Sequence, residues 1–464
     1  MGSTGHDESL PEATDPALVL ALPTAQERRK VWELTHTMWG NALVLDDYLK
    51  REEYLTTVPL AMESGITHWI LTDSRRPAND RPILSSCETL RKHAMSAEAS
   101  TTATVVDGIA HGIASVFTDP AYRGKGYAGR MLEELGHRLE RWQVTSPAHE
   151  EVGANRMASK TDSEGNGKDG APKTLFSVLY SDIGKNFYAS KGWPAFPSTH
   201  LSFPPLALPL SDTEDGAASY TSKAVHSEDG SFTVTPLGYH ELTELCPIDV
   251  QLLRARLIRR ATRRAVLGGG SGRPSLAGPS VTLVPDLNTM LWHLMREDYM
   301  TKHIFSKTPT VRGALCTLNN APQPGGSGVI VEKQRSIWVI WTRGYYSGLK
   351  TLNGEGNTLY ILHVVLEDLD DDFPADPGEV PISQQHVDGF AAIVRMAQGE
   401  AAAWRCGEVQ LWNPTPAQRI LAERSGIAYK EVLRDKDSIP SLRWHGKGLS
   451  EDVDWVANEK FGWY

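Results

Sequence analysis

The 464-residue chain has few cysteines, no long apolar run and no excess of positive charge. Its four cysteines are scattered, without the spacing of a zinc site or a disulfide framework, so we expect a reducing compartment and no bound metal. No stretch approaches the length of a membrane span, and no basic-then-apolar signal opens the chain, which predicts a cytoplasmic protein without membrane attachment. The net charge of −10 provides no overall basic field for nucleic acid.

The chain does have the length and composition of a protein with more than one folded domain. Its 464 residues, 40% of them hydrophobic, predict two to three globular domains. We expect residues 1–16 to form a flexible arm, 17–208 the first domain, 209–231 a polar linker and 232–464 the second domain. Residues 146–173 contain almost no large apolar side chains and predict a disordered insertion within the first domain.

Hydrophobic periodicity predicts the order of elements in the first domain. A short strand is followed by one or two helices, three strands, a glycine-rich turn and an amphipathic helix. After the insertion come another strand, a short helix and a last strand. The expected bounds, in order, are 17–22, 26–39, 48–60, 67–72, 83–90, 104–117, 127–142, 174–180 and 200–203.

The turn from Arg123 to Ala128 lies between a strand and a helix, a place suited to an anion. Backbone N–H groups at a helix start have no partner within the helix, and the helix dipole favours negative charge there. Gly124 and Gly126 permit positive φ and a close approach, while Arg123 and Lys125 add positive charge. A G-x-G-x-x-G spacing is also present, but the turn lies too far into the domain for a Rossmann fingerprint.

The residues Arg123-Gly-Lys-Gly126-Tyr-Ala128 match the R/Q-x-x-G-x-G/A signature of the GNAT acyltransferase superfamily, which the chain therefore resembles. Phe187-Tyr188, followed by Gly192-Trp193, resembles a second GNAT motif on the helix after the fifth strand. Both motifs lie where the expected element order requires them. The resemblance implies an α/β (α+β) GNAT fold with a mixed central sheet.

The same resemblance implies acetyl-CoA as co-substrate and assigns its contacts. The turn and the start of the following helix would hold the pyrophosphate, and backbone groups at the end of the fourth strand would polarise the thioester carbonyl. Ser181 stands where many relatives carry an asparagine that touches the pantetheine arm. The expected cofactor-binding residues are Val116, Phe117, Thr118, Arg123, Gly124, Lys125, Gly126, Tyr127, Ala128, Gly129 and Ser181.

Transfer of an acetyl group to an amine also requires a base for the amine and an acid for the departing thiolate. By resemblance, the Tyr188 hydroxyl is the candidate general acid. The fourth strand lacks the glutamate that this family often uses as a base, but Asp107 and His111 share one of its faces by period-two alternation. We therefore expect His111, with Asp107, to act as the base, and Glu88 on the third strand is a weaker rival.

The second domain is expected to repeat the order of the first. Its predicted elements are a basic helix at 250–267, a helix at 289–305, three strands, a long helix, a strand, a short helix and a strand. An acidic segment, Glu367 to Phe373, stands where the first domain has its basic turn, and would repel a pyrophosphate. This predicts a second GNAT-like domain without a CoA motif, forming one wall of the substrate cleft. The six arginines between 254 and 264 favour a salt-bridged helix over a nucleic-acid patch.

The arrangement of both halves, with the tail from Arg434 to Trp444, resembles the fungal lysine N6-acetyltransferase group. This resemblance implies acetylation of the side-chain amine of free L-lysine in lysine catabolism, with carboxylates near 367–372, or Asp437 and Ser438, as substrate contacts. Alternative functions are acetylation of polyamines or of protein and peptide amines, or a non-catalytic CoA-binding sensor or scaffold. We expect a small-molecule amine as partner, no nucleic acid and no obligatory protein partner.

Overall fold

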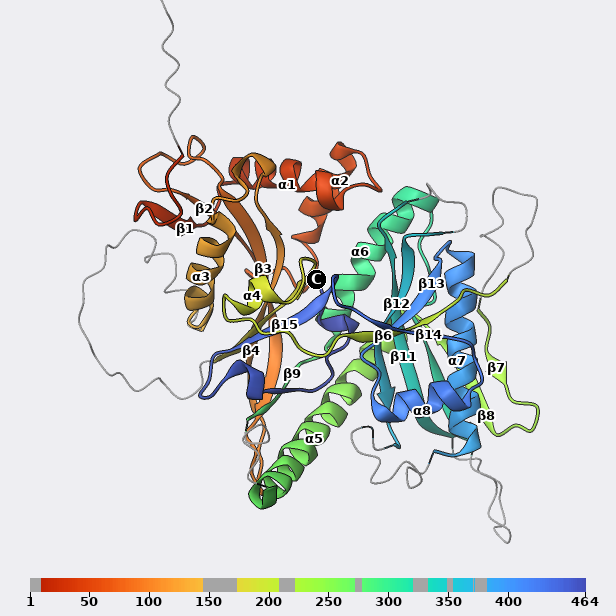
Figure 1. Cartoon of the computed structure of the whole chain (residues 1–464). Helices are drawn as coiled ribbons and strands as arrows, with labels where there is room; N and C mark the ends of the chain where they lie inside the picture. The colour runs from red at the N-terminus through yellow and green to blue at the C-terminus, as the bar shows by residue number, and fades with distance from the viewer. Residues whose placement is uncertain are drawn as a thin grey trace, which may run out of the picture.

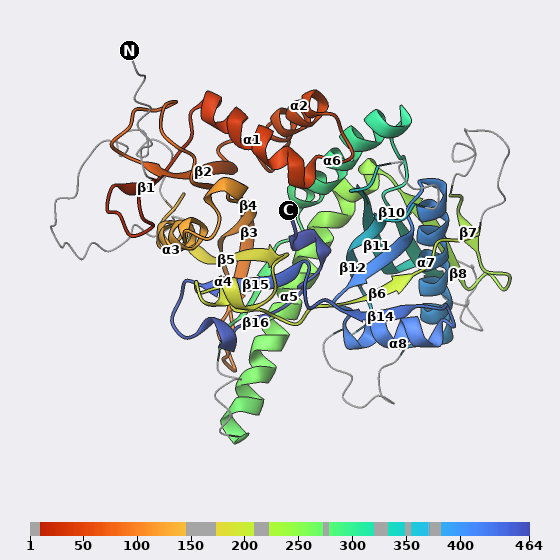
Figure 2. The same ribbon diagram turned by 45° about the horizontal axis from the view of Figure 1, so that its top comes forward.

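Two eight-stranded sheets lie side by side, with two long helices between them, in the computed structural model (Figures 1 and 2). The predicted insertion at 146–173 falls almost wholly outside the described residues, as does most of the predicted linker. The residues that the structure describes are 10–144, 173–207, 222–271, 278–319, 333–348, 354–369, 371 and 382–464.

The first sheet has the strand order β1-β2-β3-β4-β5-β15. Strands β1 to β4 are antiparallel neighbours, whereas β4 and β5 are parallel and joined through α3. The predicted order of the first domain is confirmed. The bounds are β1 (Leu18–Ala21), α1 (Ala25–Trp39), α2 (Leu45–Leu55), β2 (Ile66–Asp73), β3 (Ser85–Ala97), β4 (Val106–Phe117), α3 (Tyr127–Leu139), β5 (Thr174–Ser181), α4 (Asn186–Ala189) and β15 (Ile439–Trp444).

The second sheet has the order β14-β6-β13-β12-β11-β10-β8-β7 and repeats this pattern. Strands β8, β10, β11 and β12 are antiparallel neighbours, and β12 is parallel to β13 after the crossover through α7. The bounds are β6 (Thr199–Phe203), β7 (Val225–His226), β8 (Phe232–Leu237), α5 (Tyr239–Ser271), α6 (Leu287–Phe305), β10 (Gly313–Asn319), β11 (Lys333–Tyr345), β12 (Asn357–Leu366), α7 (Gln384–Ala403), β13 (Glu408–Trp412), α8 (Pro416–Arg424) and β14 (Lys430–Leu433).

The two halves exchange strands, which the sequence analysis did not predict. Strand β6 was expected to complete the first sheet, but it lies between β13 and β14 of the second sheet. Its place beside β5 is taken by β15, from the far end of the chain. The second half also adds β9 (Ser280–Leu283) to the edge of β3, and β16 (Asp454–Trp455) pairs with β9. The predicted domain boundary at residue 208 therefore does not separate the two sheets, because each sheet contains strands from both sides of it.

Helices α5 and α6 pack against a core that both halves share. One buried cluster joins Leu90 and Phe176 of the first sheet to Leu257, Trp292 and further side chains of the second half. The basic face of α5 is salt-bridged, as expected. Its ion pairs include Arg254–Asp107, Arg256–Asp371 and Arg260–Asp454.

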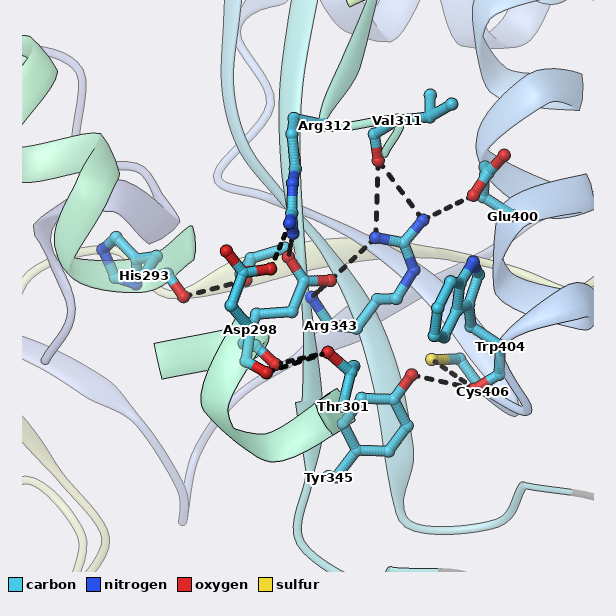
Figure 3. A network of polar contacts seen from close by, with 12 residues as sticks. His293, Asp298, Thr301, Val311, Arg312, Arg343, Tyr345, Glu400, Trp404 and Cys406 are labelled. Carbon is cyan, nitrogen blue, oxygen red and sulfur yellow. Dashed lines mark hydrogen bonds and ion pairs between the residues drawn. The ribbon is translucent and has the colours of Figure 1, made fainter. Parts of the chain in front are cut away.

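A buried ionic network fixes α6 to the second sheet (Figure 3). The Arg343 guanidinium, fully buried on β11, donates to Glu297 Oε1 at 2.7 Å and to Glu400 Oε2 at 2.6 Å. Arg312 donates to the other oxygen of Glu297 and also pairs with Asp298. Because such charges are costly to bury alone, each depends on its partners. The network therefore holds the α6 turn that carries the neighbouring residue, Arg296, in place.

Candidate active site

The glycine-basic turn has the geometry of an anion site. It follows a single 3-10 turn (Pro120–Tyr122) and ends at Gly126, which caps α3 with a left-handed backbone, φ 84°. Gly124 is also left-handed, at φ 77°, and no side chain caps the start of α3. Residues 123–126 are exposed. The start of α3 therefore lies directly after an exposed turn that carries Arg123 and Lys125, an arrangement suited to pyrophosphate binding.

Replacing Gly126 by aspartate is expected to raise the Kd for acetyl-CoA by roughly 10- to 100-fold. A side chain in a left-handed conformation costs about 1–2 kcal/mol, and a carboxylate at this position repels the pyrophosphate. Isothermal titration with acetyl-CoA measures the change.

Gly230 provides a matched control, because it also has a positive φ, 71°, with open space at its Cβ position. It lies in the turn between β7 and β8, in the other half of the protein. Gly230→Asp should leave the Kd for acetyl-CoA unchanged. Unaltered binding by the Gly126→Asp protein would place the pyrophosphate elsewhere.

Strands β4 and β5 separate just before this turn. Their parallel pairing ends at Ile113 and Leu179 among the described residues. At the same level β4 has a bulge, where the register against β3 shifts and Ser115 takes φ 51°. Bulges re-aim side chains and free backbone groups. Val116, Phe117 and Thr118, predicted to polarise the carbonyl through their backbone, follow this bulge directly, and that role stays a prediction.

Glu88 on β3 faces the bulge and has the properties of a general base. Its carboxylate accepts a hydrogen bond from the Ser115 hydroxyl at 2.7 Å and lies 3.5 Å from His68 Nε2. Burial, together with the nearby charge of Glu52, raises the pKa of Glu88 to about 7, although the Ser115 hydrogen bond opposes the shift. A carboxylate with a pKa near neutral can accept a proton at physiological pH.

The surroundings of His111 do not favour the prediction that His111, with Asp107, is the base. His111 is fully buried, its Nε2 lies 3.3 Å from the carbonyl oxygen of Trp142, and burial lowers its pKa to about 4. Asp107 lies at the start of β4 and is paired with Arg254. Alternation placed both residues on one face correctly, but that face at His111 is covered. The bulge at Ser115 then redirects the strand towards Glu88.

Tyr188 packs in the same buried cluster as Ile113 and Leu179, where the pairing of β4 and β5 ends, and Ser181 is the last residue of β5. The hydroxyl groups of Tyr188 and Ser181 differ in whether they already form hydrogen bonds within the protein. Tyr188 on α4 is 8% exposed, and its hydroxyl makes no hydrogen bond within the described part of the chain. Burial raises the pKa of this hydroxyl, so it stays protonated and able to act as an acid. The buried Ser181 hydroxyl instead donates to Gly184 O at 2.7 Å and accepts from Ile183 N, so the expected contact with the pantetheine arm is not supported.

A cavity opens from Glu88 and the β4 bulge towards the second half. Its lining includes Glu88, Ser115 and Asp182 from the first half, and Arg296 and Tyr346 from the second. His111, Asp107 and Tyr188 do not line it. The second half thus provides one wall of this cavity, and its role as a wall of the substrate cleft stays a prediction. The sequence analysis missed Asp182 and Arg296, because neither belongs to a motif.

The corresponding bulge in the second half is filled by the protein itself. The register of β12 against β11 shifts beside His363, and Val364 N donates to the Glu459 carboxylate at 3.1 Å. His363 lies between this carboxylate and Asp249. Burial alone would lower the pKa of His363, but the two carboxylates raise it to about 10. A buried charged cluster therefore occupies this bulge, and the prediction that the second half has no cofactor site stays a prediction.

The described carboxylates between 367 and 372 that were predicted to contact the substrate form ion pairs within the protein. Glu367 pairs with Arg335, Asp368 with His386, and Asp371 with Arg256, while residues 370, 372 and 373 lie outside the described residues. Asp437 is exposed and does not line the cavity, but the backbone N–H of Ser438 donates to Asp182 Oδ1 at 2.8 Å. The tail therefore positions a carboxylate of the cavity rather than supplying one.

The comparisons with known proteins agree with this geometry. A family model described as the LYC1 GNAT-like C-terminal domain matches residues 219–464, more than half of the chain. The chain belongs to this GNAT-like family. A curated lysine acetyltransferase from Yarrowia lipolytica is 27% identical over 193 residues, which are 40% of this chain and 40% of the relative. The match thus spans about two fifths of that relative's length.

Solved structures with a similar fold are distant. A GCN5-related N-acetyltransferase from Anabaena variabilis is 12% identical, with a TM-score of 0.41, over 92% of this chain and 73% of that one. An N-myristoyltransferase from Saccharomyces cerevisiae with bound myristoyl-CoA is 9% identical, with a TM-score of 0.44, over 96% and 86%. These scores add nothing to the family match, which confirms the predicted GNAT-like family. The acyltransferase activity and acetyl-CoA as its co-substrate stay predictions.

Two further features concern the part of the chain that the structure describes. None of its helices combines the length and apolar character of a membrane span. None of its clusters of His, Cys, Asp and Glu side chains has the arrangement of a metal site.

Proposed function

We propose that the protein is an acetyl-CoA-dependent N-acetyltransferase that acetylates the side-chain amine of free L-lysine, as a step of lysine catabolism. The observation that carries the proposal is the cavity between the two halves, which begins at the β4 bulge and at Glu88. The family match and the name of the Yarrowia relative support the reaction type and the amine. A cytoplasmic location, with no nucleic acid and no obligatory protein partner, stays part of this proposal.

The reaction that fits this geometry is direct attack of the amine on the thioester. An ammonium group with a pKa near 10.4 must first lose a proton, which Glu88 accepts, directly or through water. The amine nitrogen then forms a bond to the acetyl carbonyl carbon, and the C–S bond breaks. The Tyr188 hydroxyl donates its proton to the departing thiolate of CoA. The products are the N-acetylated amine and free CoA.

A CoA-release assay over free amino acids, polyamines and histone-type peptides tests the proposal. We expect lysine to give the highest kcat/KM, because a cavity lined by both halves is better suited to a small amine than to a peptide chain. Peptides as the best substrates would support protein acetylation instead. A protein that binds acetyl-CoA but releases no CoA with any amine would be a sensor or scaffold.

Tyr188→Phe separates catalysis from binding in the same assay. Loss of a general acid lowers kcat by roughly 10²- to 10⁴-fold, whereas the Kd for acetyl-CoA should change little because only the hydroxyl is removed. Tyr122→Phe, on the partly exposed turn before α3, is a matched control and should retain full activity. An unchanged kcat in Tyr188→Phe would exclude the acid role.

A further inference from the structure

The cavity contains two charges of opposite sign that have no ionic partner within the described part of the chain. Arg296 on α6 lines the cavity, and its guanidinium lies over the Trp463 ring, with no carboxylate within ion-pair distance. Asp182, just after β5, lines the same cavity and accepts a hydrogen bond from the backbone N–H of Ser438. The other basic side chain of the lining, Arg51, is already paired with Glu52.

Arg296 and Asp182 line the same cavity as Tyr346. The charges of both act on the pKa of Tyr346, which burial raises, and both also act on the buried ammonium of Lys460. Neither residue has a hydrogen bond or ion pair with the Glu88, Ser115 and His68 group at the bulge, although the charge of Arg296 acts to lower the pKa of Glu88. The cavity thus has a reactive end near Glu88 and a second region that presents a cation and an anion.

We propose that Arg296 and Asp182 bind the α-carboxylate and the α-ammonium of a free amino acid, so that the substrate class is basic α-amino acids with an amine at the far end of the side chain. The proposal rests on the function proposed above and adds how that substrate is selected. A guanidinium is suited to a carboxylate, which it binds through paired N–H donors. A zwitterionic head group would neutralise both charges, whereas a peptide-bound lysine, which has neither, would leave them unsatisfied.

The structure also explains why these two side chains are held in position. Arg296 is adjacent to Glu297, which the buried network ties to Arg312 and Arg343. Asp182 is held by the backbone of Ser438, immediately before β15, which pairs with β5. Each half of the protein therefore contributes one member of the pair from a fixed backbone.

Two analogues of lysine separate the contributions of its α-carboxylate and its α-ammonium to binding. Cadaverine lacks the carboxylate of lysine, and 6-aminohexanoate lacks its α-ammonium. We expect the parent protein to use lysine with a kcat/KM at least 10-fold above either analogue, since each analogue lacks one charge-assisted contact.

Arg296→Met should raise KM for lysine and for 6-aminohexanoate by roughly 10- to 100-fold and leave cadaverine unaffected. Asp182→Asn should raise KM by the same factor for lysine and cadaverine and leave KM for 6-aminohexanoate unchanged. These changes follow from loss of one charge-assisted hydrogen bond each. The controls are Arg29→Met and Asp80→Asn, exposed residues away from the cavity, which should alter none of the three substrates.

The outcomes distinguish the two proposals. If no amine releases CoA, the acetyltransferase function fails. If lysine is acetylated but each variant lowers activity equally with all three substrates, or the parent uses cadaverine as well as lysine, the function stands and the head-group site is wrong. Unchanged Kd values for acetyl-CoA and unchanged thermal unfolding show that the variants remain folded and bind the co-substrate.

Discussion

Glu88→Gln is expected to lower kcat by about 10²- to 10⁴-fold, the usual contribution of a general base. The amide oxygen can still accept the Ser115 hydrogen bond, so the local structure should be kept. Steady-state kinetics with saturating acetyl-CoA measures the loss. The parent protein should also show a rise in kcat/KM as the pH increases through about 7, because Glu88 must be deprotonated to act.

The pH profile tests the assignment independently of the size of the loss. The rise near pH 7 should be absent from the residual activity of Glu88→Gln. In Ser115→Ala the rise should move to higher pH, since the hydrogen bond from Ser115 lowers the pKa of Glu88. A profile that is unchanged in Glu88→Gln would mean that another group accepts the proton. His111 would be the first to reconsider, although its pKa of about 4 predicts no rise near neutral pH.

Glu297→Gln is expected to lower the free energy of unfolding by about 3–5 kcal/mol, the cost of breaking a buried ion pair. Glu297 accepts hydrogen bonds from the side chains of Arg312 and Arg343 and from the backbone N–H of Arg343. With its charge removed, both guanidinium groups would be left only partly compensated in the interior. Urea unfolding followed by tryptophan fluorescence measures the change.

Glu33→Gln is the matched control, because Glu33 forms an ion pair with Arg29 in which both side chains are largely exposed. Removal of an exposed pair changes stability by about 0–1 kcal/mol. Equal losses in the two variants would mean that the buried network does not stabilise α6. A loss confined to Glu297→Gln should be accompanied by a higher KM for lysine, since the adjacent Arg296 would no longer be held in place.

Much of the fold could be predicted from local signals in the sequence. Thr24 with Glu27 forms the capping box that begins α1, and apolar periodicity located most strands of both sheets, although not β7, β9, β15 or β16. Gly124 and Gly126 have the positive φ that the turn requires. These features depend on neighbouring residues, so the residue pattern is sufficient to predict them.

The remaining features depend on contacts between distant segments. Period-two alternation in β4 was extended as far as Ser115, but the bulge already breaks the alternation there, and this favoured His111 over Glu88. The strands that pair with β6 could not be predicted either, since the sequence of a five-residue strand does not indicate which sheet it joins. Asp182 and Arg296 come together only after both halves have folded.

The strand exchange makes the two halves inseparable. A fragment ending after residue 208 would leave the edge of β5 without β15, and would carry β6 with no sheet to enter. Such an open edge invites pairing with other chains, so fragments of either half should aggregate when expressed alone and regain solubility only when produced together. The exchanged strands also limit hinge motion between the two halves, which form the walls of the cavity. We therefore expect substrates to enter and leave through movements of side chains or loops rather than through separation of the halves.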